Sequence, residues 1–252
     1  MTERLELRLG IIGGLGPLAS ADFYRKLTEL TPARVDTDHL PLVLLSIPQL
    51  PDRTEAILSG SDAVLKQLLV AVRMLDSLGV ESIAMPCNTA HHWFERLAAE
   101  TSADLVHIVD SVVEEMGHGF AGRRVAVLAT PGTLSSGFYQ DRLLAAGYEV
   151  CVPSAADFQR DVNRAIADVK AGDVAGAGVA LGNALAACRQ AGIEAAILAC
   201  TELSVMSRVV DSAGLAIFDS NSALAMACLR RLGYVAAEDA NNVQPASRRR
   251  AG

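Results

Sequence analysis

The sequence predicts an α/β protein made of two similar halves, each a mostly parallel sheet flanked by helices, with a cleft between the halves. Short apolar runs alternate with amphipathic segments of helix length, which is typical of parallel sheets covered by helices. The order of motifs in the second half repeats that of the first at an offset of 113–116 residues. The chain has 252 residues, of which 51% are apolar and 20% charged, so it can bury a large core.

In the first half, apolar periodicity separates strands from helices. Residues three or four apart share one helix face, as Phe23, Tyr24 and Leu27 do, whereas short continuous apolar runs indicate buried strands. Gly79 ends the longest periodic segment and is a suitable helix C-cap. The elements expected in order are a strand at Leu9–Ile12, a turn at Gly13–Pro17, a helix from Leu18, a strand at Leu42–Ile47, a turn at Pro48–Asp52, a helix at Asp62–Leu78 and a strand at Ser82–Met85.

The second half contains counterparts of these segments, and internal repeats of this kind reveal duplicated architecture. Leu9–Ile12 corresponds to Val125–Leu128, and Phe23-Tyr24 to Phe138-Tyr139. Gly79–Thr89 corresponds to Gly192–Glu202. We therefore expect one domain from residues 1–116 together with 216–235, which includes a closing helix at Ser222–Leu232. Residues 117–215 form the second domain, and residues 236–252 a solvated tail.

Composition narrows the classes of function. The formal net charge is −7 and only three residues are lysines, which argues against a surface for nucleic acid or anionic membranes. Val174–Cys188 is apolar but too short to span a bilayer, and the first residues lack the order of a signal peptide, so we expect a cytoplasmic protein. The five cysteines are expected to be reduced, and no spacing among them indicates zinc or another metal. Asp22 and Glu81 are expected to be solvated charges.

Two cysteines occupy equivalent positions in the repeat. Cys87 and Cys200 each follow a buried strand and precede a helix, which places both at the carboxyl ends of parallel strands, where ligands bind in open α/β sheets. A helix N-terminus stabilises a thiolate, so we expect the pKa of both thiols to be lowered. Either cysteine alone would fit a small core residue; the duplicated pair favours a functional site.

Two thiols on opposite faces of one small molecule suit the inversion of a carbon acid. One thiolate removes a proton from one face, and the other thiol delivers a proton to the opposite face. The developing negative charge needs hydrogen-bond donors at the substrate carboxylate. Asn88, Thr89 and Thr201, at the starts of helices, are suitable for that role, although Thr89 also fits a plain N-cap.

Four motifs together resemble those of the pyridoxal-phosphate-independent aspartate/glutamate racemase family, over about residues 7–232. They are Gly13–Pro17, Pro48–Thr54, Pro86–His91 and Ala199–Glu202. The resemblance implies a cofactor-free reaction that needs no pyridoxal phosphate, a homodimer, and Cys87 and Cys200 as the catalytic pair. It also implies an amino-acid substrate, aspartate first among the candidates, with glutamate or a broader range as the alternative.

The resemblance extends to the residues that would bind the substrate. Asn88, Thr89 and Thr201 would hold the α-carboxylate, and Arg53 the side-chain carboxylate, which suits the planar guanidinium. The remaining substrate-binding candidates are Leu15, Thr130 and Lys170. Glu202 stands where glutamate racemases typically have a histidine, which favours aspartate racemases or those of broader range.

Three other functions compete with this one. Gly14, Gly16 and Ala19 after a strand fit a relaxed dinucleotide fingerprint, but Pro17 interrupts the turn and the second half repeats the cysteine motif instead. The same duplicated domains could form an amino-acid-binding protein without catalysis. A third alternative is a relative that isomerises or decarboxylates an activated acid, which the retention of both cysteines disfavours.

Overall fold

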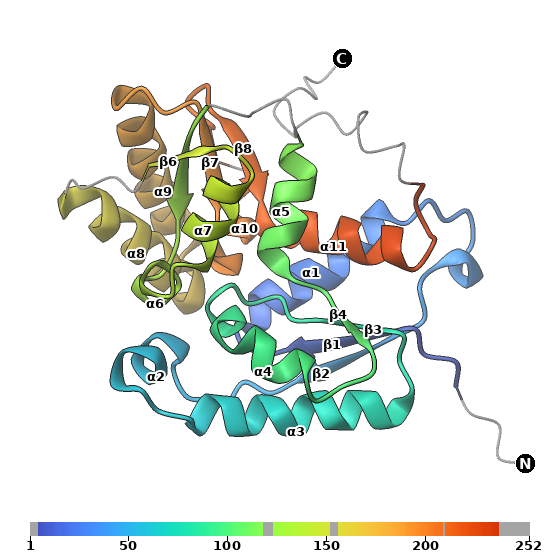
Figure 1. Ribbon diagram of the computed structural model, residues 1–252. Coiled ribbons are helices and arrows are strands. Elements are labelled where there is room, and N and C mark those ends of the chain that lie inside the picture. Colours follow the sequence, from blue (N-terminus) through green and yellow to red (C-terminus); the bar gives the residue numbers. More distant parts are fainter. Residues whose placement is uncertain (1–4, 118–122, 152–155, 209, 237–252) are drawn as a thin grey trace, which may run out of the picture.

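Two four-stranded parallel sheets with the same strand order form the frame of the protein. The computed structural model describes residues 5–117, 123–151, 156–208 and 210–236 (Figure 1). The first sheet has the order β2-β1-β3-β4 and the second β6-β5-β7-β8. The order of corresponding strands is identical, so the predicted α/β fold with two pseudo-symmetric halves is confirmed.

The strands are short and lie close to the positions expected from sequence. The first sheet contains β1 (Leu9–Gly13), β2 (Leu42–Ser46), β3 (Ser82–Ala84) and β4 (Asp104–Leu105). The second contains β5 (Arg124–Leu128), β6 (Glu149–Cys151), β7 (Ala195–Leu198) and β8 (Ala216–Asp219). In both sheets the first strand of the half pairs with two neighbours and lies in the centre.

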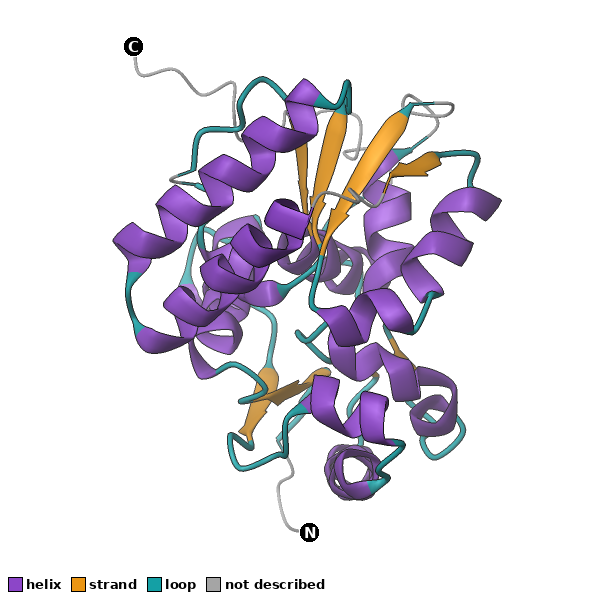
Figure 2. Ribbon diagram, turned by 90° about the vertical axis from the view of Figure 1, so that its left-hand side faces the viewer, coloured by secondary structure: helices purple, strands orange, loops and turns teal. Residues whose placement is uncertain are grey.

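Helices form three layers around the two sheets (Figures 1 and 2). The layer between the sheets contains α1 (Pro17–Leu30), α5 (Ile108–Met116) and α11 (Ser220–Arg231), and α11 packs against both of the others. The outer faces carry α3 (Ala63–Leu78) on the first sheet and α8 (Ala156–Ala171) with α9 (Val174–Gln190) on the second. The short helices are η1 (Asp36–Asp38), α2 (Arg53–Ser59), η2 (Thr89–Trp93), α4 (Phe94–Ala98), α6 (Pro131–Ser135), α7 (Phe138–Ala145) and α10 (Thr201–Val205).

The alternation of side chains along the strands explains why the repeat produces this layering. Leu9 and Ile11 on β1 join the central core, and so do their counterparts Val125 and Val127 on β5. Ile12, one residue further along β1, belongs instead to the core beneath α3. Successive residues of a strand point to opposite faces, so corresponding residues of β1 and β5 that face the central layer meet in one shared core.

A buried ion cluster joins the two halves inside the central layer. Lys26 Nζ lies 2.8 Å from a carboxylate oxygen of Asp22 and also pairs with Asp219, which caps α11. It donates a further hydrogen bond to the Ser204 carbonyl at 3.1 Å. The prediction that Asp22 is solvated is wrong: its side chain is buried, because the packing of α11 on α1 encloses it. Glu81 is exposed, as expected, and pairs with Arg8.

The predicted elements agree with the structure to within a few residues. Gly79 caps α3 in the left-handed conformation with φ 75°, as expected of a C-cap glycine. The last helix begins at Ser220 rather than Ser222, because Asp219 accepts hydrogen bonds from the next backbone N–H groups. Residues 118–122, near the start of the expected second domain, and residues 237–252 of the expected tail lie outside the described residues. The domain boundaries stay a prediction. In the described chain, no helix has both the length and the apolarity to cross a membrane.

Candidate active site

The candidate site lies where the carboxyl ends of the two sheets meet. The turn after β1 brings Leu15 to this edge, and Gly14 makes that turn possible with φ 82°. A Cβ on Gly14 would lie 2.4 Å from the backbone nitrogen of Ile47, so only glycine allows the loops after β1 and β2 to approach this closely.

One small chamber collects all nine residues that the sequence marked as candidates. Its walls come from both sheets and contain Leu15, Asp52, Arg53, Thr54, Cys87, Asn88, Thr89, Thr130, Lys170, Cys200, Thr201 and Glu202. The chamber has a volume of about 20 Å³, enough for about one water molecule. An amino acid can therefore enter only if the walls move apart.

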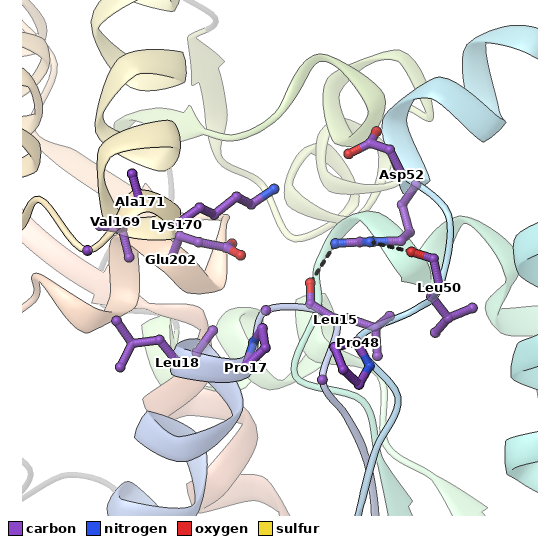
Figure 3. Close-up of a pocket in the computed structure, with 15 residues that line it drawn as sticks. Leu15, Pro17, Leu18, Pro48, Leu50, Asp52, Val169, Lys170, Ala171 and Glu202 are labelled. Carbon is purple, nitrogen blue, oxygen red and sulfur yellow. Dashed lines mark hydrogen bonds between the residues drawn. The ribbon is translucent and has the colours of Figure 1, made fainter.

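A larger cavity of about 650 Å³ adjoins the chamber. Arg53, Lys170 and Glu202 line both spaces. Figure 3 shows Lys170 and Glu202 reaching into the cavity from one side, Asp52 and Leu50 on the opposite side, and Leu15, Pro17 and Leu18 along its floor. The cavity therefore combines apolar walls with charged groups of both signs.

Cys87 follows β3 and is 6% exposed. Burial raises the pKa of its thiol; the nearby Arg53 guanidinium opposes this rise, and Glu202 adds to it. The backbone is held by His91, whose Nδ1–H donates to the Cys87 carbonyl at 2.9 Å, while Ile108 N–H donates to Nε2. His91 thus has a structural role behind the thiol.

Cys200 stands at the N-cap of α10 and is 5% exposed. Its thiol donates to Glu202 Oε2 at 3.0 Å. Burial raises the pKa of Cys200 well above the ordinary value, and the Glu202 carboxylate raises it further. The expectation that helix N-termini lower the pKa of both thiols is therefore wrong in this structure. Burial outweighs the helix dipole, because a thiolate loses its hydration in the closed chamber.

The side chain of Asn88 forms hydrogen bonds with two other side chains of the protein. Tyr139 OH donates to Asn88 Oδ1 at 2.6 Å, and Asn88 Nδ2 donates to Ser220 Oγ at 2.9 Å. The Ser220 hydroxyl donates in turn to the Leu198 carbonyl at 2.8 Å. Asn88 therefore fastens the Cys87 loop to the end of β7.

Thr89 belongs to a cluster of three hydroxyl groups. Its Oγ1 lies 2.9 Å from Thr130 Oγ1 and 3.0 Å from Thr133 Oγ1. Thr130 is the N-cap of α6, and its hydroxyl accepts from Thr133 N–H at 3.2 Å. Thr89 is not an N-cap, since η2 is preceded by Asn88. Thr89 and Thr130 line the chamber, so their hydroxyls offer hydrogen-bond donors and acceptors to a substrate carboxylate.

Arg53 is the first residue of α2, and three backbone carbonyls orient its guanidinium. Nη2 donates to Leu15 O at 2.6 Å, and Nη1 donates to Pro51 O at 3.2 Å and to Leu50 O at 3.5 Å. The last of these is at the limit of hydrogen bonding. Lys170, in the last turn of α8, supplies the second cation of the chamber. Two cations that line one chamber suit a substrate that carries a carboxylate.

Three lining residues were not among the sequence candidates: Asp52, Thr54 and Glu202. The first two flank Arg53 in the Pro48–Thr54 motif, and Asp52 caps α2 by accepting from Glu55 N–H at 2.9 Å. Glu202 belongs to the Cys-Thr-Glu motif, and its two-residue distance from Cys200 was the available signal. Among the described residues, no three His, Cys, Asp or Glu side chains are grouped to hold a metal ion.

The sequence is similar to a family of racemases and to an amino-acid racemase of broad specificity. The family described as Asp/Glu/hydantoin racemase matches residues 12–228. The broad specificity amino-acid racemase RacX of Bacillus subtilis (strain 168) is 31% identical over 166 residues, which cover 64% of this chain and 70% of RacX.

Solved structures show the same relationship. The aspartate racemase of Picrophilus torridus has 31% sequence identity and a TM-score of 0.79, with 90% of this chain and 94% of that chain covered. An aspartate racemase homologue from Pyrococcus horikoshii OT3 has 26% identity and a TM-score of 0.70, with 91% of this chain and 100% of that chain covered.

Proposed function

Because the chain belongs to the Asp/Glu/hydantoin racemase family, we propose that it interconverts L- and D-aspartate with Cys87 and Cys200 as its two acid–base groups. Family membership makes it an isomerase, an amino-acid racemase independent of pyridoxal phosphate. The observation that supports the cysteine pair is that both thiols, from equivalent strand ends of the two sheets, line one chamber.

The proposed reaction passes one proton through each cysteine. One thiolate takes the α-proton from one face of the substrate, and the other thiol returns a proton to the opposite face. The negative charge that develops flows into the α-carboxylate, which we assign to Thr89, Thr130 and Thr201. Asn88 contributes through its backbone, since its side chain already bonds Tyr139 and Ser220.

Arg53 and Lys170 are the groups that we assign to the side-chain carboxylate of aspartate. Both line the chamber and the adjoining cavity, and a guanidinium already oriented by carbonyls loses little entropy when it binds an anion. Leu15 completes this wall, and its carbonyl holds Arg53 in place.

The test is exchange of the α-proton. L- and D-aspartate incubated in D2O without pyridoxal phosphate should each gain deuterium and form the other enantiomer. Cys87→Ser and Cys200→Ser should each abolish inversion, whereas Cys151→Ser, a cysteine outside the chamber, should not. Absence of exchange and inversion for every amino acid tested would refute the racemase assignment, and activity in both serine variants would refute the cysteine pair.

A second candidate is racemisation of glutamate or of a broader range of amino acids. It is favoured by the cavity of about 650 Å³, which leaves room for side chains larger than that of aspartate, and by the similarity to RacX. The same exchange assay with a panel of amino acids separates the two candidates. Binding of an amino acid without exchange would instead indicate a non-catalytic binding protein. A homodimer in the cytoplasm is part of this proposal, and light scattering tests the dimer.

A further inference from the structure

The two oxygens of the Glu202 carboxylate have different surroundings. Its Oε2 accepts the hydrogen bond from the Cys200 thiol, whereas its Oε1 is buried and has no hydrogen-bond partner. The residue is 6% exposed. A buried oxygen without a hydrogen-bond partner lowers the stability of the folded protein. This points to a functional role for the Glu202 carboxylate rather than a stabilising one.

The turn after β1 leaves the space that Glu202 occupies. A Cβ on Gly16 would lie 2.4 Å from Glu202 Oε1. The backbone at Gly16 is extended, so the need for glycine here comes from the carboxylate and not from strain. The first half of the chain thus makes room for an acidic group beside the cysteine of the second half.

The two cysteines therefore have different neighbours. Cys87 is influenced by the Arg53 guanidinium, which favours a thiolate, as well as by Glu202, which opposes one. Cys200 is in direct contact with the Glu202 carboxylate, which disfavours a thiolate there. The repeat supplies two equivalent thiols, and positions at which the two halves differ make their surroundings different, since Glu202 takes the place that Thr89 has in the first half.

We propose that Glu202 keeps the shared proton of the cysteine pair on Cys200 in the free protein, so that the prevailing form is ready to react with the enantiomer whose α-proton faces Cys87. The opposite enantiomer reacts with the less populated form, in which Cys87 carries the proton and Cys200 is the base. The inference rests on the proposed racemase function and adds to it the place of the shared proton. It makes Glu202 a positioning residue for the proton of Cys200.

The proton balance of one turnover that starts from the prevailing form follows from this. The Cα–H bond breaks and an S–H bond forms on Cys87, while the electron pair enters the substrate carboxylate. The S–H bond of Cys200 then breaks and a C–H bond forms on the opposite face. The pair is left as Cys87 thiol and Cys200 thiolate, and after product release a proton passes from Cys87 back to Cys200. Repulsion by Glu202 drives this return.

Several elements face Cys200 with titratable or charged groups, and all of them enter the balance. They are Glu202 from α10, Cys87 after β3, Tyr139 from α7, Lys170 from α8, Arg53 from α2 and Asp52 before α2. Among these, Glu202 is the group that accepts the Cys200 thiol proton in a hydrogen bond. Its removal should therefore change Cys200 more than it changes Cys87.

The ratio of activities on the two enantiomers cannot test this proposal. Enantiomers are equally stable in solution, so thermodynamics requires equal kcat/KM in both directions whichever cysteine carries the proton. The reactivity of each thiol is the direct measurement, because the thiolate is the form that alkylates.

The experiment is alkylation of the folded protein by iodoacetamide at a fixed, mildly alkaline pH, with the labelled peptides quantified by mass spectrometry. In the wild type, Cys87 should label before Cys200. In Glu202→Gln the labelling rate of Cys200 should rise about tenfold, which corresponds to about one pKa unit, and that of Cys87 should rise less. The matched control is Glu55→Gln, which removes the same charge from an exposed position on α2 and should match the wild type.

Each outcome decides the proposal. The proposal is wrong if Cys200 is labelled in Glu202→Gln at the same rate as in the wild type. It is also wrong if Cys200 is labelled faster than Cys87 in the wild type. Cys200 that stays unlabelled in both proteins also overturns it, because burial alone would then hold the proton. If Glu202→Gln does not fold by circular dichroism, Glu202→Asp, which withdraws the carboxylate by one methylene, is judged by the same rates. Since labelling needs no substrate, a failed racemase assay and a failed labelling assay are distinguishable.

Discussion

Tyr139 and Asn88 are joined by a hydrogen bond of 2.6 Å, although they lie 51 residues apart and follow different sheets. Asn88 continues the connection to Ser220, and Ser220 to the carbonyl of Leu198, two residues before Cys200. The loop that carries one thiol is thus fixed to the strand that carries the other. The separation of the two cysteines depends on this chain of three side chains.

Tyr139→Phe should therefore weaken both stability and activity. The change leaves Asn88 Oδ1 buried without its donor, which costs about 1–3 kcal/mol of unfolding free energy. Because the Cys87 loop loses an anchor, kcat should fall while KM changes little. Urea unfolding and the racemase assay measure the two effects.

Tyr148→Phe is the matched control, since this hydroxyl donates to the Gly117 carbonyl, outside the candidate site. It should lower stability without lowering kcat. An equal loss of kcat in both variants would show that Asn88 does not transmit the effect.

Arg53→Lys tests whether the guanidinium selects acidic substrates. Lysine keeps the charge but cannot bond Leu15 O and a substrate carboxylate in the same fork. Loss of one charged hydrogen bond, about 2 kcal/mol, should lower kcat/KM for aspartate roughly thirtyfold. The loss with alanine should be smaller, because alanine has no side-chain carboxylate. Equal losses for the two substrates would remove Arg53 from side-chain recognition.

The fold could be predicted from the sequence, and so could the gathering of the candidate residues at one edge, because both depend on patterns along the chain. Cys87 and Cys200 follow apolar strands that repeat, and strand ends of a parallel sheet meet at one edge. The pKa values of the two thiols could not be predicted in the same way, because they depend on how tightly the chamber encloses the thiols and on the charge of Glu202 beside them. The burial of Asp22 was missed for a similar reason: its partner Lys26 bonds Asp219, 193 residues away along the chain.

Stability should fall as the pH decreases from 6.5, in part because of His91. Burial lowers the pKa of His91 to about 4, below its ordinary value of 6.5. Between these values the unfolded chain binds a proton that the folded chain does not, so folding loses up to about 1.4 kcal/mol per pH unit from this group. The contribution is complete above pH 6.5.

His91→Asn removes this titration and should give a flatter dependence of unfolding free energy on pH. Urea unfolding of both proteins across that interval measures the difference in slope. The variant should be less stable than the wild type at neutral pH, where His91 bonds Cys87 O and Ile108 N–H. Parallel curves for the two proteins would contradict the assignment of His91 as a buried neutral histidine.

Lys26→Met should cost about 3–5 kcal/mol of unfolding free energy at neutral pH, because it leaves the Asp219 carboxylate buried without its cation and leaves Asp22 with Arg25 alone. Lys66→Met is the matched control, since this lysine is exposed on α3 and should change stability by no more than about 0.5 kcal/mol.

The loss of stability in Lys26→Met should also depend on pH. Burial alone raises the pKa of Asp219, and Lys26, with its neighbours, brings it below the ordinary 3.8 in the wild type. The wild type therefore keeps this stabilisation above pH 3.8 and loses it as the pH falls toward the folded pKa. In the variant burial dominates, Asp219 takes up a proton at higher pH, and the deficit shrinks as the solution becomes acidic. Urea midpoints of the two proteins at several pH values test this, and a deficit that does not vary with pH would mean that Lys26 acts through packing rather than charge.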